Sequence, residues 1–345
     1  MRNDDLAGPW RPDVLAGFEQ RQMKLPGGEI ATLIRRQAAG PADAAGRPAA
    51  RRPAAGPQGS GSARSATVRK PAVLYLHGFV DYFFQTHMAD AFEERGYRFY
   101  AIELRGYGRS IAHGQDPDHP NFVPEIAVYA QDLDAAAELI AEEEGHSELI
   151  GLGHSTGGLI MPLWAAKRPG RLKAMVLNSP WLDFNAGWIM RGPFTQVMHL
   201  IAKVAPMAPV SGIKVHYGRA LHHETGGEWD YDLTWKPHDG FPAYPVWFSS
   251  VRRWQARVAE GIGLDCPVLM MTSLRRGDNA HHHDELVTTD SVLDPAQMWR
   301  LAPKLGADVE VRALEGGAHD LSLSPEPVRS RFLEESLDWL DRVTA

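Results

Sequence analysis

Cysteine is almost absent from this sequence, which excludes a fold held together by internal disulfides. The 345 residues contain one cysteine, Cys266, so no disulfide can form within the chain. Its place at the start of an apolar stretch is typical of a small buried side chain rather than of a nucleophile. A reducing compartment suits such a chain, and we expect a cytoplasmic protein.

Long apolar runs and an excess of positive charge are also lacking. No stretch approaches the roughly 20 apolar residues that a membrane-spanning helix needs, so we expect no membrane span. The first ten residues include two acids and no apolar core, which argues against a signal peptide. The formal net charge is -7, so we expect no global basic field and no nucleic-acid partner.

What stands out is a glycine-rich stretch at residues 153–157, Gly-His-Ser-Thr-Gly. An apolar, strand-like run precedes it and a helix-like segment follows, which is the context of a G-x-S-x-G nucleophile elbow. The flanking glycines let strand and helix approach without Cβ clashes. The helix N-terminus favours negative charge on a reacting oxygen, so Ser155 is the candidate nucleophile and the Thr156 N–H a candidate oxyanion donor. A glycine-rich turn without chemistry is the alternative.

The N-terminal region predicts a hairpin followed by a low-complexity insertion. Residues 17–25 and 29–35 look like two strands joined by a Pro-Gly-Gly turn. From residue 37 to about 67 the chain is mostly Ala, Gly, Pro, Ser and Arg, and it cannot bury enough apolar surface to offset its ordering entropy. We therefore expect residues 1–36 to form an edge hairpin of the core and residues 37–67 a disordered insertion.

Beyond this insertion, short apolar runs alternate with amphipathic stretches of 10 to 15 residues. This alternation predicts βαβ units and a mostly parallel sheet. The predicted core comprises residues 68–183 and 262–345, with residues 184–261 inserted between them. Strand-like runs lie at residues 72–76, 97–104, 148–154, 172–180, 265–272 and 308–314, and helix-like stretches at 87–95, 128–144 and 325–343.

The inserted segment, residues 184–261, is rich in aromatic side chains, proline and glycine and has no clear strand period. One interpretation is a small satellite hydrophobic core. The other is a cap over Ser155 whose aromatic lining receives an apolar substrate chain, and the two are compatible. The aromatic residues are Trp188, Phe194, Trp229, Tyr231, Trp235, Phe241, Tyr244, Trp247, Phe248 and Trp254.

A serine nucleophile needs a general base, usually histidine, and a carboxylate that orients this base. In one common chain order the acid and then the histidine follow the serine. The best-placed histidine downstream of Ser155 is His319, in a glycine-containing turn just after the last predicted strand. A surface histidine without a catalytic role is the alternative.

Four motifs together carry a resemblance to a known family: residues 76–79 (Leu-His-Gly-Phe), 105–110 (Arg-Gly-Tyr-Gly-Arg-Ser), 153–158 and 317–320 (Gly-Ala-His-Asp). The sequence resembles α/β-hydrolases of the serine aminopeptidase, monoacylglycerol lipase and lysophospholipase branch, over most of the chain outside the insertion. This resemblance implies an α/β-hydrolase fold, with a mostly parallel sheet of about eight strands flanked by helices and an inserted cap. It also implies a second oxyanion N–H, from Phe79.

The acid is where the sequence departs from the family's pattern. The family usually places it in a short turn directly after the strand at residues 267–272. Here the run Asp290-Ser-Val-Leu-Asp-Pro better resembles the family's acid-containing run before a helix, which would span residues 296–305. Residues 274–289 are then an insertion and Asp290 is the candidate acid. The alternatives that stay open are Asp278, Asp284 and Asp294.

Histidine clusters raise the question of a metal. Residues 281–283 are three histidines, and imidazole suits zinc or nickel. Adjacent loop histidines cannot all turn to one ion, so we predict no metal there, nor at the pair at residues 222–223. We also predict no organic cofactor. His77 is interpreted as a packing and hydrogen-bonding residue beside the oxyanion loop.

These observations predict a serine hydrolase that cleaves carboxylic esters through an acyl-enzyme, using Ser155, His319 and Asp290. The resemblance favours lipid-type substrates such as a monoacylglycerol or a lysophospholipid, with transient contact with a lipid surface. One alternative is a non-catalytic small-molecule-binding protein that retains the fold. The other is an aminopeptidase or amidase, which would anchor a substrate ammonium on acids of the cap. The candidate anchors are Glu224, Glu228, Asp230 and Asp232.

Overall fold

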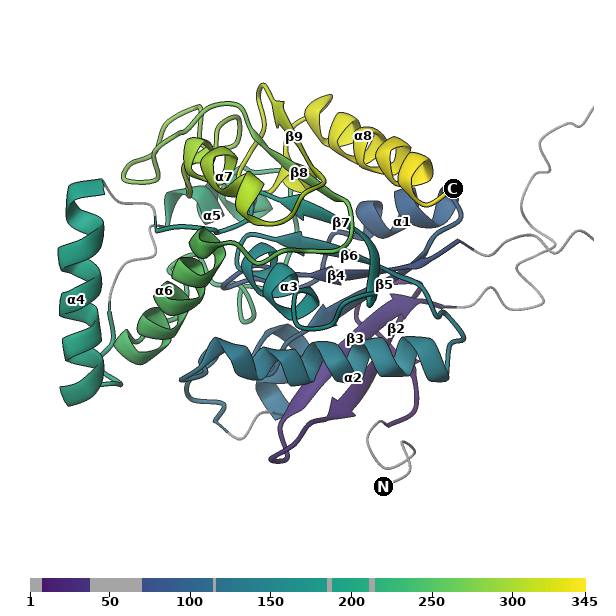
Figure 1. Ribbon diagram of the computed structural model, residues 1–345, viewed down its shortest axis with the longest axis horizontal. Coiled ribbons are helices and arrows are strands. Elements are labelled where there is room, and N and C mark those ends of the chain that lie inside the picture. Colours follow the sequence, from purple (N-terminus) through teal and green to yellow (C-terminus); the bar gives the residue numbers. More distant parts are fainter. Residues whose placement is uncertain (1–7, 38–69, 114–115, 185–187, 211–214) are drawn as a thin grey trace, which may run out of the picture.

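The computed structural model describes residues 8–37, 70–113, 116–184, 188–210 and 215–345 (Figure 1). The predicted low-complexity insertion, residues 37–67, lies outside the described residues except for its first position. No helix in the described ranges is long and apolar enough to cross a membrane.

A nine-stranded sheet runs through the described part of the chain, with strand order β1-β2-β3-β5-β4-β6-β7-β8-β9. The pairs from β1 to β5 in this order are antiparallel, and those from β5 to β9 are parallel. The mostly parallel sheet predicted from the sequence is therefore confirmed. The strands are β1 (Arg11–Pro12), β2 (Phe18–Lys24), β3 (Ile30–Arg36), β4 (Ala72–Leu76), β5 (Arg98–Glu103), β6 (Leu149–His154), β7 (Leu172–Asn178), β8 (Val268–Ser273) and β9 (Val309–Leu314).

Helices cover both faces of this sheet (Figure 1). Helices α1 and α8 pack on one face, and α2, α3 and α6 pack toward the other. The α-helices are α1 (Thr86–Glu94), α2 (Tyr129–Glu142), α3 (Gly157–Ala165), α4 (Trp188–Val204), α5 (His216–Leu221), α6 (Pro245–Glu260), α7 (Pro295–Leu301) and α8 (Val328–Val343). Short 3₁₀ helices are η3 (Gly108–His113), η4 (Ile126–Val128), η5 (His223–Thr225), η6 (Ala302–Lys304) and η7 (Leu321–Leu323).

The central strands are buried on both sides, which explains why they read as continuous apolar runs. In β4, Leu74 and Leu76 belong to the cluster beneath α2 and α3, whereas Val73 and Tyr75 belong to the cluster beneath α1 and α8. Successive strand residues point to opposite faces, so a run without polar alternation fills two cores at once.

The N-terminal hairpin forms as predicted, because β2 and β3 pair antiparallel from Phe18↔Arg36 to Lys24↔Ile30. It adds to the parallel strands through β3, which pairs with β5. The two-residue β1 outside it was not predicted from the sequence. A strand of two residues shows no periodicity, so only its pairing with β2 identifies it.

The described residues of the aromatic segment, 184–261, include three α-helices, α4, α5 and α6, that the sequence did not suggest. Pro193 lies inside α4, and a proline in a helix interior normally argues against helix. Pro245 instead begins α6, where its missing N–H has no cost. Figure 1 shows α4 at the edge of the molecule, next to α6 and away from the sheet.

Candidate active site

The candidate nucleophile lies in a sharp turn between β6 and α3. Ser155 has a φ of 51°, a left-handed backbone conformation that residues other than glycine rarely adopt. A Cβ at Gly153 would lie 2.8 Å from the carbonyl oxygen of Gly157, and one at Gly157 would collide with the carbonyl oxygens of Leu76 and His77. Glycine is therefore required on both sides of the turn, as the nucleophile-elbow motif predicts.

The sheet order brings the candidate residues together. Ser155 follows β6, Phe79 follows β4, Asp290 follows β8 in the chain and His319 follows β9. Strands β4 and β6 are neighbours, with Leu76 opposite Gly153. Because the carboxyl ends of parallel strands meet at one edge of a sheet, side chains far apart in sequence converge there.

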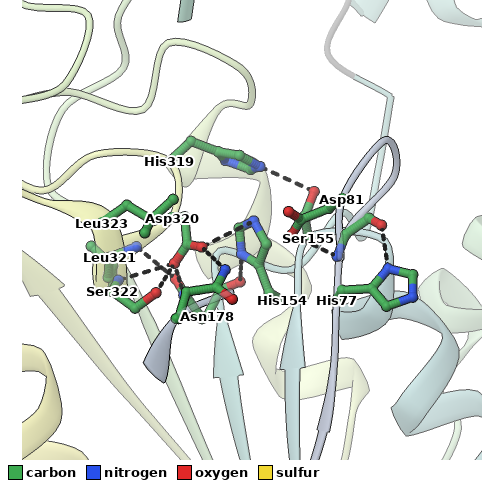
Figure 2. A network of polar contacts seen from close by, with 12 residues as sticks. His77, Asp81, His154, Ser155, Asn178, His319, Asp320, Leu321, Ser322 and Leu323 are labelled. Carbon is green, nitrogen blue, oxygen red and sulfur yellow. Dashed lines mark hydrogen bonds and ion pairs between the residues drawn. The ribbon is translucent and has the colours of Figure 1, made fainter. Parts of the chain in front are cut away.

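At this edge three side chains form a continuous chain of hydrogen-bonding contacts. The Nε2 atom of His319 lies 3.0 Å from the Oγ atom of Ser155 (Figure 2). The Nδ1 atom of His319 lies 3.0 and 3.1 Å from the two carboxylate oxygens of Asp290. A carboxylate can only accept, so Nδ1 carries a proton, and in the neutral imidazole Nε2 then presents its lone pair to the serine hydroxyl.

Asp290 is fully buried and is held in its ionised form. Burial raises the pKa of this carboxyl, but the charge of His319 and hydrogen bonds from His319 and from two backbone N–H groups outweigh it and keep the pKa below its usual value. The backbone donors are Leu293 and Val292, at 2.7 and 3.1 Å from Oδ1. An ionised, fixed carboxylate is what orienting a histidine requires.

The three alternative acids lie elsewhere. Asp294 caps α7 by accepting from the N–H of Ala296 at 3.1 Å. Asp278 is exposed and pairs with His281, with 3.0 Å between Oδ2 and Nδ1, and Asp284 is also exposed. Among the four candidate acids, Asp290 is therefore the one that the fold brings to His319.

The predicted oxyanion donors flank Ser155. Thr156 directly precedes α3, so its N–H belongs to the positive end of that helix. Gly78 packs tightly against the elbow, because a Cβ there would lie 3.2 Å from the Cβ of Ser155. The peptide that joins Gly78 to Phe79 is thus next to the serine, and the N–H of Phe79 is part of this peptide.

His77 fixes the orientation of that peptide. Its Nε2 atom accepts the N–H of Leu104 at 3.2 Å, so Nδ1 carries the proton and donates to the carbonyl oxygen of Gly78 at 2.8 Å. In a planar trans peptide the N–H points opposite to the C=O, so holding this carbonyl also sets the direction of the Phe79 N–H. Burial lowers the pKa of His77 to about 4 and keeps it neutral.

A second buried polar network lies beside the candidate triad (Figure 2), and the sequence analysis did not single it out. One carboxylate oxygen of Asp320 accepts from the side-chain amide of Asn178 at 2.7 Å, and the other lies 4.0 Å from Nε2 of His154. Asp81, in the loop that follows β4, forms an ion pair with Lys236 at 2.5 Å. No sequence motif links these residues, because the partners lie far apart in the chain: Asp81 and Lys236 are separated by 155 positions, and Asn178 and Asp320 by 142.

Two groups of side chains in the described ranges have the spacing to hold a metal ion. In the buried group, Asp81, His154 and Asp320, the ammonium of Lys236 already compensates Asp81. The other group combines the histidine pair at residues 222–223 with Asp230, but His222 faces the carbonyl of Tyr231 with Nε2 and the N–H of Glu224 with Nδ1. The three adjacent histidines at residues 281–283 belong to neither group.

A cavity of about 480 Å³ opens beside Ser155 and His319. Its apolar lining includes Phe79, Trp181, Phe184, Val292, Leu293 and Leu323. Its polar lining includes Asp81, Lys236, His238, Arg276, Asp278 and Asn279. Residues 217–218, 231 and 236–238 come from the aromatic segment, and residues 276–279 from the predicted insertion before Asp290.

The predicted aromatic lining needs correction. Of the aromatic residues named from the sequence, Tyr231 lines this cavity. Several others pack in hydrophobic clusters instead. Trp247 stacks on Phe79 with 4.4 Å between the ring centroids, and Trp235 meets Tyr82 edge-on with 5.2 Å between the centroids. Rings separated by proline and glycine follow no period, so sequence alone cannot tell those that face the cavity from those that fill a satellite core.

The acids predicted as an anchor for a substrate ammonium lie outside the lining of the cavity. All four are exposed to solvent, and none belongs to its lining. They are Glu224, Glu228, Asp230 and Asp232.

Comparisons with known proteins agree with this fold. Residues 67–226 match the family described as "Serine aminopeptidase, S33". A monoacylglycerol lipase of Mycolicibacterium smegmatis is 29% identical over 142 residues, which cover 41% of this chain and 48% of the lipase. Epoxide hydrolase 4 of mouse is 32% identical over 126 residues, which cover 36% of this chain and 32% of that protein. The chain thus spans half or less of the length of these relatives.

A solved structure extends the likeness to nearly the whole chain. A soluble variant of monoglyceride lipase from Saccharomyces cerevisiae, in complex with a substrate analog, superimposes with a TM-score of 0.61 and 17% identity. The match covers 99% of this chain and 96% of the yeast chain, and at this identity it shows the fold. The resemblance predicted from the four motifs is therefore confirmed: the protein has the α/β-hydrolase fold, and its sequence is similar to the serine aminopeptidase S33 family over residues 67–226.

Proposed function

We propose that this protein is a serine esterase that cleaves carboxylic esters of lipid type through an acyl-enzyme. The observation that carries the proposal is the hydrogen-bonded series Ser155–His319–Asp290, with distances of 3.0 Å at the serine and 3.0 to 3.1 Å at the carboxylate. A serine at a strained turn, a histidine and a buried carboxylate in this order form the machinery of nucleophilic acyl transfer.

In the proposed reaction, Oγ of Ser155 attacks the ester carbonyl carbon while Nε2 of His319 takes the hydroxyl proton. The carbonyl oxygen becomes an oxyanion that accepts hydrogen bonds from the N–H groups of Phe79 and Thr156. Loss of one such donor typically lowers the rate by about 100- to 1,000-fold. The intermediate collapses, the leaving alkoxide takes the proton from His319, and the acyl group stays on the serine.

Water then completes the cycle. His319 removes a proton from a water molecule that attacks the acyl carbon, and the second tetrahedral intermediate releases the carboxylic acid and the free serine. Asp290 stabilises the positive charge that His319 carries in both steps. This sequence of steps draws on the protein's own residues throughout.

An ester of lipid type is favoured over an aminoacyl substrate by the cavity. Its apolar lining, which includes Trp181, Phe184 and Leu293, suits an acyl chain. Asp81, one of the acids in its lining, is already paired with the ammonium of Lys236, so it is not available to anchor a substrate ammonium. Two of the proteins that this chain resembles, a monoacylglycerol lipase and a monoglyceride lipase, support the same class.

We further propose that residues 184–261 form a cap and that α4 contacts the lipid surface from which substrate enters. Three side chains on this helix, Val197, Leu200 and Val204, are 51%, 64% and 75% exposed. Their spacing of three and four residues places them on one face of the helix, and Figure 1 shows α4 at the edge of the molecule. An exposed apolar stripe of this kind suits a lipid interface.

The experiment is a p-nitrophenyl ester series from acetyl to palmitoyl, run beside Ser155→Ala and a stoichiometric fluorophosphonate labelling test. We expect labelling at Ser155, turnover that rises with chain length, and loss of both in the variant. Absence of labelling and turnover would favour the non-catalytic binding protein. Labelling without ester turnover, followed by release of product from aminoacyl amides, would favour the aminopeptidase.

A further inference from the structure

A lysine of the predicted cap reaches the loop that carries a proposed oxyanion donor. Lys236 lies between η5 and α6, and its Nζ atom is 2.5 Å from the Oδ1 atom of Asp81. The side chains are 15% and 3% exposed, so this ion pair is largely shielded from water. A shielded pair is sensitive to loss of one partner, because the remaining buried charge is left uncompensated.

Asp81 connects the lysine to the oxyanion loop, residues 77–81. Its second carboxylate oxygen, Oδ2, accepts the backbone N–H of Gly78 at 3.3 Å. The next peptide is the one whose carbonyl is held by His77 and whose N–H belongs to Phe79. The carboxylate therefore binds the cap with one oxygen and the oxyanion loop with the other.

The oxyanion loop needs such support because its backbone is strained. Val80 has a φ of 50°, and for a β-branched residue this left-handed conformation is a genuine outlier. Strain of this kind costs roughly 1 to 3 kcal/mol and persists only where the surroundings enforce it. Val80 lies directly before Asp81, so the ion pair restrains the residue that follows the strained one.

Further contacts hold the same stretch of the cap against the residues after Asp81. The N–H of Asp232 donates to the hydroxyl of Tyr82 at 2.6 Å, and the ring of Trp235 meets Tyr82 edge-on. The ammonium of Lys236 also lies 5.1 Å from the centre of the Phe84 ring. These contacts hold the backbone and side chain of Lys236 close to Asp81, so forming the ion pair costs little further conformational entropy.

We propose that Lys236 is a positioning residue: through Asp81 it holds Gly78 and Val80 in the strained loop conformation that directs the Phe79 N–H at the oxyanion. This rests on the proposed esterase function. Lys236 contacts Asp81 and the rings of Phe84 and Tyr231, and the proposed effect on the reacting atoms passes through Asp81 and the loop. Packing of the cap against the core then also completes the oxyanion site.

The test compares Lys236→Met with Lys236→Arg, which keeps the charge. On a soluble short-chain p-nitrophenyl ester we expect Lys236→Met to lower kcat by about 10- to 100-fold, a fraction of one oxyanion donor, with KM changed less than threefold. We expect Lys236→Arg to recover at least part of the loss. The affinity for an alkyl trifluoromethyl ketone, which forms an oxyanion on Ser155, should fall in parallel with kcat/KM.

A matched control is Arg252→Met. Arg252 lies on α6 and pairs with Asp183 at 2.9 Å, with 14% exposure on both sides, so it also joins the predicted cap to the core without touching the oxyanion loop. It should leave kcat within threefold of the wild type. Equal losses in both variants, or a Lys236→Met variant with a lowered Tm and unchanged kcat, would overturn the proposal. An inactive, unlabelled wild type would instead refute the esterase function itself.

Discussion

At the scale of single residues, the proposed chemistry depends on which atoms of His319 are protonated. Asp290 accepts from Nδ1, which leaves the Nε2 lone pair facing Ser155. The protons of His77 are fixed in the same way in a structural role. Its Nδ1 donates to the carbonyl oxygen of Gly78 and its Nε2 accepts the N–H of Leu104, an arrangement that requires the neutral ring. Buried polar groups with complete partners specify single conformations, and this precision is what an acyl-transfer site needs.

A residue-scale prediction concerns Asp290→Asn. An amide at this position can donate to Nδ1 of His319 and stabilise the other tautomer, so Nε2 would carry the proton and could no longer take one from Ser155. We expect kcat on a p-nitrophenyl ester to fall by roughly 10³- to 10⁴-fold with little change in Tm.

The control for this variant is Asp284→Asn, because Asp284 was an alternative acid, is exposed and does not line the cavity. It should retain wild-type kcat within about threefold, a surface change of small energetic effect. A large loss in Asp284→Asn together with an active Asp290→Asn would show that Asp290 has been misassigned.

At the scale of elements, the site is made by the order of the strands. Ser155 and Phe79 are neighbours because β4 and β6 pair in parallel, although the chain visits β5 and α2 between them. Secondary structure was well predicted where periodicity is strong: the helix expected at residues 128–144 is α2, Tyr129–Glu142. It was missed in α4 and α6, where proline and dense aromatic residues obscure the pattern.

An element-scale prediction concerns the apolar stripe of α4. Replacing Val197, Leu200 and Val204 together by serine removes the apolar surface proposed to enter a lipid interface, at about 1 kcal/mol or more for each side chain. We expect hydrolysis of a long-chain monoacylglycerol in vesicles to fall by at least about tenfold, while hydrolysis of a soluble short-chain ester stays unchanged.

Val311→Ser is the matched control, because Val311 is 39% exposed and lies on β9, away from α4. Neither assay should respond to it. If the triple variant lost both activities equally, the stripe would be needed for folding or catalysis rather than for lipid contact.

At the scale of the whole molecule, buried histidines link stability to pH. Burial lowers the pKa of His77 to about 4, and it also lowers the pKa values of His87 and His154. Between the unfolded value of 6.5 and the folded value, the unfolded chain binds more protons, so stability is lost as pH falls. Asp132 opposes this, because burial raises its pKa from 3.8 to about 6 and the folded state then gains protons first.

The corresponding prediction compares the wild type with His77→Asn by urea unfolding at pH 7 and pH 5. For His77 alone, a shift from 6.5 to about 4 makes the free energy of unfolding about 2 kcal/mol smaller at pH 5 than at pH 7. The variant should lose less stability across this interval by about that amount, whatever its stability at pH 7. An identical difference in both proteins would mean that His77 does not remain neutral in the fold.

Features formed by neighbouring residues could be predicted from the sequence alone. The elbow around Ser155 and the glycine-containing turn at His319 could be recognised because each is a short motif next to a strand. The alternation of apolar runs indicated the parallel sheet, because strands buried on both faces must be apolar throughout. The preference for Asp290 came from a resemblance, and the sequence left three other acids open.

Features that depend on residues far apart in the chain became visible in the folded structure. It brings Asp290 rather than Asp278 to His319, packs most of the named aromatic rings away from the cavity, and joins Lys236 to Asp81 across 155 positions. The physical reason is that a carboxylate or an ammonium has no periodicity of its own. Its role is set by the partner that the folded backbone carries to within 3 Å, and a single sequence does not reveal that partner.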